Sequence, residues 1–226
     1  MRQKLYIEST VWYQMVNYVS SGFKERTEEM FELIKENKYE IYISNIVLEE
    51  ISLNNKKYRE KLYSLIKKYK PLVIFENKDI ELLAHAYTEN AFSEKKKVDV
   101  ICDAFHAAIA TVANITYMVS YNYRNLLNIG IQEHMKSVNL LAGYTNNLLI
   151  LPPIMFLKKD EYHGETGTVN NLVWEIKRSY GKKLEALEKK TIIRRLNYHK
   201  DLTNRLIKKL SLKTVTIEHE ASMVIL

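Results

Sequence analysis

Apolar residues along positions 1–150 recur with two periods, one typical of strands and the other of helices. Runs of β-branched and aromatic residues predict strands at Lys4–Ile7, Glu40–Ser44, Leu72–Phe75 and Ile115–Val119, and either Val138–Leu141 or Leu148–Leu151 supplies a last strand. Segments with a helical period lie between them, at Glu25–Glu36, Asn45–Leu53, Lys56–Lys70, Asp79–Ala91 and Val98–Ala113. This alternation predicts an α/β fold over residues 1–156, a three-layer α/β/α domain with a mainly parallel sheet.

The pattern changes after Phe156. Residues 157–171 contain two glycines and few apolar residues, which predicts a linker. Leu172–Leu187 and Thr191–Leu210 have the helical period and are rich in Lys and Arg, whereas the end of the chain has the character of a strand. We therefore expect a basic, mostly helical extension at residues 172–226, too small to form a large core of its own.

Composition narrows the class of protein. Hydrophobic residues make up 46% of the chain and charged residues 27%, values typical of a globular protein. The single cysteine, Cys102, excludes a disulfide scaffold and a Cys-cluster zinc site, and its apolar surroundings predict a buried thiol. Neither a signal peptide nor a membrane span is predicted, so we expect a protein of the reducing cytoplasm.

The net charge of +7 is unevenly distributed. Residues 1–157 carry a net charge of +1, whereas residues 158–226 carry +6. Basic segments bind phosphates by releasing counterions, so the C-terminal extension has an electrostatic preference for nucleic acid that the first part lacks.

Candidate functional residues follow the predicted strands. Glu8, Ser9 and Thr10 come after the first strand, Ser44, Glu49 and Glu50 after the second, and Ser120, Tyr121 and Asn122 after the fourth. Ligands of open α/β sheets bind at the carboxyl ends of the strands, so we expect these residues at one edge. The helix before the fourth strand adds Asp103, with Asp99 and His106 on the same face.

Asp103 is the most informative of these residues, because it lies within the apolar run DAFHAAIA. A carboxylate is costly to bury unless it is paired or binds a metal. Asp99 also fits an acid at a helix N-terminus, and His106 fits a structural histidine as well as a functional one. A cluster of oxygen donors without cysteine favours Mg²⁺ or Mn²⁺.

Four segments together resemble the PIN domain: YIESTVWY, SNIVLEEI, DAFHAAIA and YMVSYN. The resemblance covers residues from about 5 to 153 and is greatest for the branch whose first acid is Glu, which includes VapC-like toxins of type II toxin–antitoxin systems. It implies a metal-dependent endoribonuclease that hydrolyses RNA at an acidic site.

The resemblance also implies a role for individual residues. Glu8, Glu50 and Asp103 correspond to acids that hold Mg²⁺ or Mn²⁺, and Asn122 completes the catalytic set in a position where many PIN domains have Asp. Glu49 is the competing choice for the second acid and is expected to be a solvated neighbour. Thr10, Asp99 and His106 are expected beside the metal ligands or against the substrate.

The extension has three alternative roles. The segment WEIKRSYGKKL faintly resembles the short helical antitoxins that accompany this branch, which implies self-inhibition through Arg178, Arg194 or Arg195. The other two are RNA binding and packing on the domain. For the whole chain, an active ribonuclease is the leading hypothesis, and a PIN-like protein that binds RNA or regulates a toxin–antitoxin pair is the alternative. The partners considered are RNA, an antitoxin protein and a second copy of the chain in a homodimer.

Overall fold

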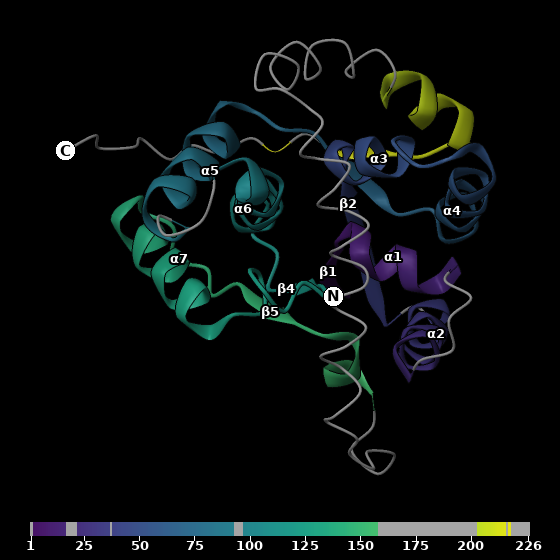
Figure 1. Ribbon diagram of the computed structural model, residues 1–226, viewed down its shortest axis with the longest axis horizontal. Helices are drawn as coiled ribbons and strands as arrows, with labels where there is room; N and C mark the ends of the chain where they lie inside the picture. Colours follow the sequence, from purple (N-terminus) through teal and green to yellow (C-terminus); the bar gives the residue numbers. More distant parts are fainter. Residues whose placement is uncertain are drawn as a thin grey trace.

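The computed structural model describes residues 2–16, 22–36, 38–92, 97–157, 203–215 and 217, with the backbone alone for residues 97–99. The described residues form a six-stranded sheet in which every pairing is parallel, with the strand order β5-β4-β1-β2-β3-β6. Helices lie on both sides of this sheet (Figure 1), which confirms the predicted three-layer α/β/α fold.

Most predicted elements are found within a few residues of their expected ends. The strands are β1 (Gln3–Ile7), β2 (Tyr39–Ser44), β3 (Leu72–Ile74), β4 (Tyr117–Val119), β5 (Leu149–Leu151) and β6 (Thr214–Val215). The helices are α1 (Ser9–Val16), α2 (Gly22–Lys35), α3 (Asn45–Ser52), α4 (Lys56–Tyr69), α5 (Lys78–Asn90), α6 (Lys97–Val112) and α7 (Ile129–Leu141), with a 3-10 turn η1 (Pro153–Phe156) and a helix at 203–210.

Two groups of helices enclose the sheet. On one side α5 packs against α6 and α7, and on the other α1 packs against α2 and α4 (Figure 1). Helix α3 contacts both α4 and α6, so it bridges the two groups beyond the end of β2. This position places α3 over the edge where the central strands end.

Strand β1 lies at the centre of the sheet. It pairs with β2 on one side and with β4 on the other, as expected for the three strands that precede the candidate residues. Leu5, Tyr6 and Ile7 are completely buried, because both faces of the sheet are covered by helices. The carboxyl ends of these three strands therefore open onto one buried edge.

The region between β4 and β5 differs most from the prediction. Of the two candidates for the last strand, Leu148–Leu151 is confirmed, while Val138–Leu141 belongs to helix α7. Asn128 caps this helix by accepting a hydrogen bond from the backbone N–H of Ile131 at 3.2 Å. Its apolar residues Ile129, Leu140 and Leu141 are exposed, and they obscure the helical period in the sequence.

Residues 203–215 pack on the domain, which agrees with the packing alternative for this part of the extension. The side chains of Leu206, Leu210 and Leu212 are buried, and β6 adds a sixth strand beside β3. The helix predicted at Thr191–Leu210 is present over 203–210, and the strand follows it. The helix predicted at Leu172–Leu187 lies outside the described residues.

Two smaller expectations have different outcomes. Cys102 is exposed on α6, so the prediction of a buried thiol was wrong: its neighbours in sequence are apolar, but its position on the helix faces solvent. Within the described residues, no helix is both long and apolar enough to cross a membrane.

Candidate metal and acid site

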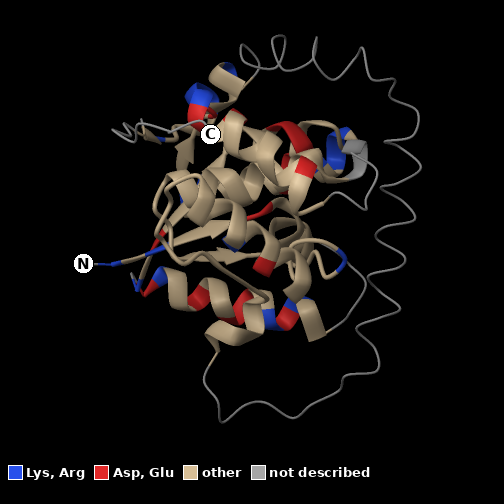
Figure 2. Cartoon of the chain, turned by 90° about the vertical axis from the view of Figure 1, so that its left-hand side faces the viewer, with Lys and Arg blue, Asp and Glu red and all other residues tan. Residues whose placement is uncertain are grey.

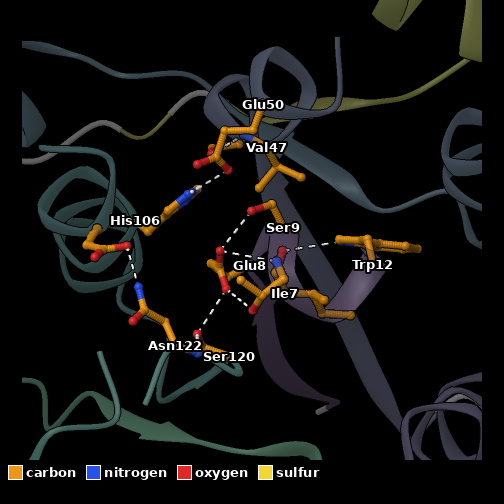
Figure 3. Close-up of polar contacts among 12 residues, drawn as sticks. Ile7, Glu8, Ser9, Trp12, Val47, Glu50, His106, Ser120 and Asn122 are labelled. Carbon is orange, nitrogen blue, oxygen red and sulfur yellow. Dashed lines mark hydrogen bonds and ion pairs between the residues drawn. The ribbon is translucent and has the colours of Figure 1, made fainter. Parts of the chain in front are cut away.

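The site is built where β1, β2 and β4 end. Glu8 directly follows β1, Ser44 is the last residue of β2, and Ser120 directly follows β4. Helix α3 supplies Glu50 and helix α6 supplies His106 (Figure 3), and α6 also carries Asp103. Segments far apart in the sequence are therefore brought together by the strand order.

Glu8 is a buried carboxylate surrounded by hydroxyl groups. Ser9 Oγ donates to Glu8 Oε1 at 2.8 Å, and Ser120 Oγ donates to Oε2 at 2.9 Å (Figure 3). The Thr10 hydroxyl also donates to Oε2, and its backbone N–H donates to Oε1. With only 2% of its surface exposed, Glu8 is held in one orientation by these donors.

Two of these three hydroxyls accept hydrogen bonds from the backbone of the loop after β4. The backbone N–H of Tyr121 donates to Thr10 Oγ1 at 2.9 Å, and that of Asn122 donates to Ser120 Oγ at 2.9 Å. Thr10, predicted to lie beside the metal ligands or against the substrate, is thus engaged with Glu8 and with the backbone. Its geometry suits an orienting role for the carboxylate.

His106 links Glu50 to the interior. Its Nε2 lies 3.1 Å from Glu50 Oε2, and its Nδ1 lies 2.7 Å from the hydroxyl of Tyr6. The Tyr6 hydroxyl also lies 2.7 Å from Ser44 Oγ, the group that caps α3 by accepting from the backbone N–H of Val47. His106 is completely buried, so every polar atom of its ring is used within this chain of contacts.

The charge around His106 favours its protonated form. Burial lowers the pKa of the imidazole, but the charge and hydrogen bond of Glu50 and the charges of Glu8 and Asp103 outweigh it, so the pKa is raised. A protonated ring would donate from both nitrogens, to Glu50 and to the Tyr6 hydroxyl. A ring nitrogen that binds a metal ion carries no proton, so His106 either donates to Glu50 or binds the ion from the same nitrogen.

One group of side chains has the spacing needed to hold a metal ion. Ligand atoms of Glu8, Glu50 and His106 all lie within 4.8 Å of one another. Two carboxylates and an imidazole suit a divalent cation such as Mn²⁺, and the carboxylates suit Mg²⁺. The ligand set predicted from the sequence was Glu8, Glu50 and Asp103; His106 takes the place of Asp103 in this group.

Asp103 lies at the same edge but has different partners. Asn122 Nδ2 donates to its Oδ1 at 2.9 Å, and Asn125 Nδ2 donates to its Oδ2 at 2.6 Å. The backbone N–H of Asn125 donates to Asn122 Oδ1 at 3.1 Å, which fixes the two amides relative to each other. Asn122 therefore positions Asp103.

Burial is the main influence on the acidity of Asp103. It raises the pKa from the ordinary value of 3.8 to about 7, against the hydrogen bond from Asn125, which lowers it. The charges of Glu8 and Glu50 raise the pKa and that of His106 lowers it. A pKa in this range suits a carboxyl group to act as a general base or acid near neutral pH.

The remaining predicted residues lie elsewhere or are not described in side-chain detail. Glu49 is adjacent to Glu50 on α3 but contacts Asn45 and Thr203, so it is no solvated neighbour of the site. Asp99 lies on α6, where the structure describes its backbone but not its side chain. Basic and acidic side chains are interspersed over the surface in the view of Figure 2.

Tyr6 and Asn125 were not predicted as site residues. Tyr6 lies inside a strand, and its sequence context suggests a residue of the hydrophobic core. Its side chain nevertheless lies on the face of the strand that faces α3 and α6, opposite those of Leu5 and Ile7. Asn125 follows Asn122 by three residues, the spacing of an Asx-type turn, and that spacing was the available signal. No protein-family model matches this sequence, and the comparison with curated proteins found no match.

Proposed function

We propose that this chain is a metal-dependent endoribonuclease of the PIN-like type. The observation that carries the proposal is the convergence of Glu8, Glu50 and Asp103, from three separate segments, on one edge of the sheet. The spacing of Glu8, Glu50 and His106 supports a metal site, and the buried position of Asp103 supports proton transfer beside it.

Hydrolysis of a phosphodiester builds negative charge on the phosphoryl oxygens and on the leaving oxygen. A divalent cation held by Glu8 and Glu50 would neutralise that charge and make the attacking water more acidic. Ser9, Thr10 and Ser120 keep the Glu8 oxygens in place, and His106 orients Glu50 from the other side. Asp103, with a pKa of about 7, would accept the proton of the water at one of its carboxylate oxygens.

Cleavage of RNA by the full chain in the presence and absence of Mg²⁺ or Mn²⁺ tests the proposal. Asp103→Asn should abolish cleavage while the protein remains folded, because an amide cannot accept the proton. Asp79→Asn, the same substitution in the first turn of α5, is the matched control and should retain cleavage. A folded Asp103→Asn variant that cuts RNA at the original rate would refute the assignment.

The same assay separates the alternative function. RNA that binds to the full chain but is not cut with either cation would favour the PIN-like binding or regulatory protein. Binding measured over a range of salt concentrations then reports how many phosphates are contacted.

Self-inhibition by the extension is tested by substitution rather than truncation. Removal of residues 158–226 would also remove β6 and expose the surface that Leu206, Leu210 and Leu212 cover, so a truncated protein should lose solubility. Arg178, Arg194 and Arg195 lie outside the described residues. If one of them pairs with the acidic site, its replacement by Gln should increase cleavage by the full chain.

A further inference from the structure

A second group of oxygen atoms lies beside the first site, around Glu49 of α3. Glu49 and Glu50 are consecutive residues, but Glu50 contacts His106, whereas Glu49 accepts a hydrogen bond from Asn45 Nδ2 at 3.1 Å. Thr203 Oγ1, from the C-terminal segment, lies 3.5 Å from the same oxygen, Glu49 Oε1. This second group therefore joins α3 to the segment that carries β6.

Glu76 belongs to the same group. The register of β2 and β3 pairs Ser44 with Ile74, so Asn45 and Glu76 both emerge just beyond the carboxyl ends of neighbouring strands. The negative charge of Glu76, like that of Glu50, raises the pKa of the Glu49 carboxyl. Two carboxylates that share a half-buried position repel each other unless a positive charge lies between them.

Two oxygens of this group lack a partner. Among the described residues, Asn45 Oδ1 and Glu76 Oε2 are buried and take part in no hydrogen bond. Asn45 is only 2% exposed, and its amide is directed at Glu49 through the Nδ2 contact. Buried oxygen acceptors without a donor are unfavourable, and a cation is the partner that satisfies several at once.

We propose that Asn45, Glu49, Glu76 and Thr203 form a second binding site for a hard divalent cation. The donors are two carboxylates, an amide oxygen and a hydroxyl, the set that Mg²⁺, Mn²⁺ and Ca²⁺ select and that zinc or copper do not. Because Thr203 belongs to the helical residues 203–210, a cation here ties the C-terminal segment to α3 and to the loop after β3. Its role is to fasten this segment, apart from the chemistry of the first site.

The number of Mn²⁺ ions bound per full-length chain tests the inference, measured by equilibrium dialysis or from the electron paramagnetic resonance of the free ion. Glu76→Gln should bind one ion fewer than the unaltered protein, and Glu50→Gln should lose a different ion. Glu60→Gln, at an exposed position on α4, is the matched control and should bind as many ions as the unaltered protein. If Glu76→Gln binds as many ions as the control with unchanged affinity, the second site does not exist.

A structural readout covers the case in which Glu76→Gln folds poorly. In the unaltered protein Mg²⁺ should slow amide hydrogen exchange over residues 203–215, and Glu49→Gln should weaken that dependence on Mg²⁺ concentration by about tenfold or more. Exchange that ignores Mg²⁺ in the unaltered protein would overturn the inference. If Glu50→Gln binds fewer ions and Glu76→Gln binds as many as the unaltered protein, the proposed catalytic site is supported and the second site is refuted.

Discussion

Glu8 and Asp103 share one edge of the sheet, but the protein holds them in different ways. Hydroxyl groups and a backbone N–H surround Glu8, from the first turn of α1 and the loop after β4. Two side-chain amides hold Asp103, both from that same loop. A hydroxyl can donate or accept a hydrogen bond, whereas an amide NH₂ group only donates. Both side-chain amides that contact Asp103 therefore act as donors to its carboxylate. These donors favour the ionised form of Asp103, whereas burial raises its pKa to about 7; on that balance our proposal assigns the proton to Asp103 and the cation to Glu8.

Beyond Asp103→Asn, the largest effect is expected from Glu8→Gln. The substitution removes a charge from the Glu8, Glu50 and His106 group, so Mn²⁺ binding at that group should be lost. Cleavage should fall by more than the roughly 10- to 100-fold that is typical for residues that only orient a ligand. Calorimetric titration with Mn²⁺ measures the binding. If Asp103→Asn loses the ion and Glu8→Gln keeps it, the division of tasks is the reverse of ours.

The second effect concerns stability against pH. The folded state raises the pKa of Asp103 from 3.8 to about 7, so between these values the folded chain keeps a proton that the unfolded chain releases. The contribution of Asp103 to the free energy of unfolding is therefore complete below about pH 4 and is lost as the pH rises to about 7. The loss is on the order of a few kcal/mol.

Urea unfolding of the unaltered protein and of Asp103→Asn over this pH range isolates the effect, with metal removed by chelator. The free-energy difference between the two proteins should change between about pH 4 and pH 7 and be constant outside it. The raised pKa of Glu49 has no contribution from Asp103 and cancels between the two proteins, whereas that of His106 cancels only in part, because the charge of Asp103 helps to raise it. A difference that is constant throughout would show that Asp103 stays ionised.

Asn125→Ala should have a smaller effect on activity. Asp103 then loses its 2.6 Å donor, and since that hydrogen bond lowers the pKa of Asp103, the pKa should rise further. Cleavage should fall by about 10- to 100-fold, and the pH at which activity is half-maximal should move upward. Asn90→Ala, an exposed position on α5, is the control. Reduced activity with an unchanged pH profile would mean that Asn125 acts only on the fold.

Ser120→Ala should have the smallest effect. Glu8 Oε2 loses one donor, and the backbone N–H of Asn122 loses its acceptor, but Ser9 and Thr10 still hold the carboxylate. We expect a loss of about 1–3 kcal/mol in the free energy of unfolding. Ser64→Ala on the surface of α4 should change it much less. Equal losses in both would remove any special role for the Ser120 hydroxyl.

The three-layer fold and the positions of Glu8, Glu50 and Asp103 could be predicted because they depend on periodicity and on the topology of parallel sheets. The partners of these residues could not be predicted in the same way. His106 joins Glu8 and Glu50 because its ring is fixed by Tyr6, a contact between residues 100 positions apart. Helix α7 was missed because three of its apolar residues are exposed, which hides the period on which the prediction depends.

Strand β6 has a consequence for the order of folding. Thr214 and Val215 pair with Val73 and Ile74, so more than half of the chain lies between two neighbouring strands. Closing a loop of this length costs conformational entropy before the strand contacts contribute any favourable free energy. Such pairings therefore form late in folding. During synthesis the outer edge of β3 therefore stays unpaired until the C-terminal residues have left the ribosome. An unpaired strand edge can pair with strands of other chains. We expect refolding to show a slow final phase, and aggregation to be most severe while that phase is incomplete.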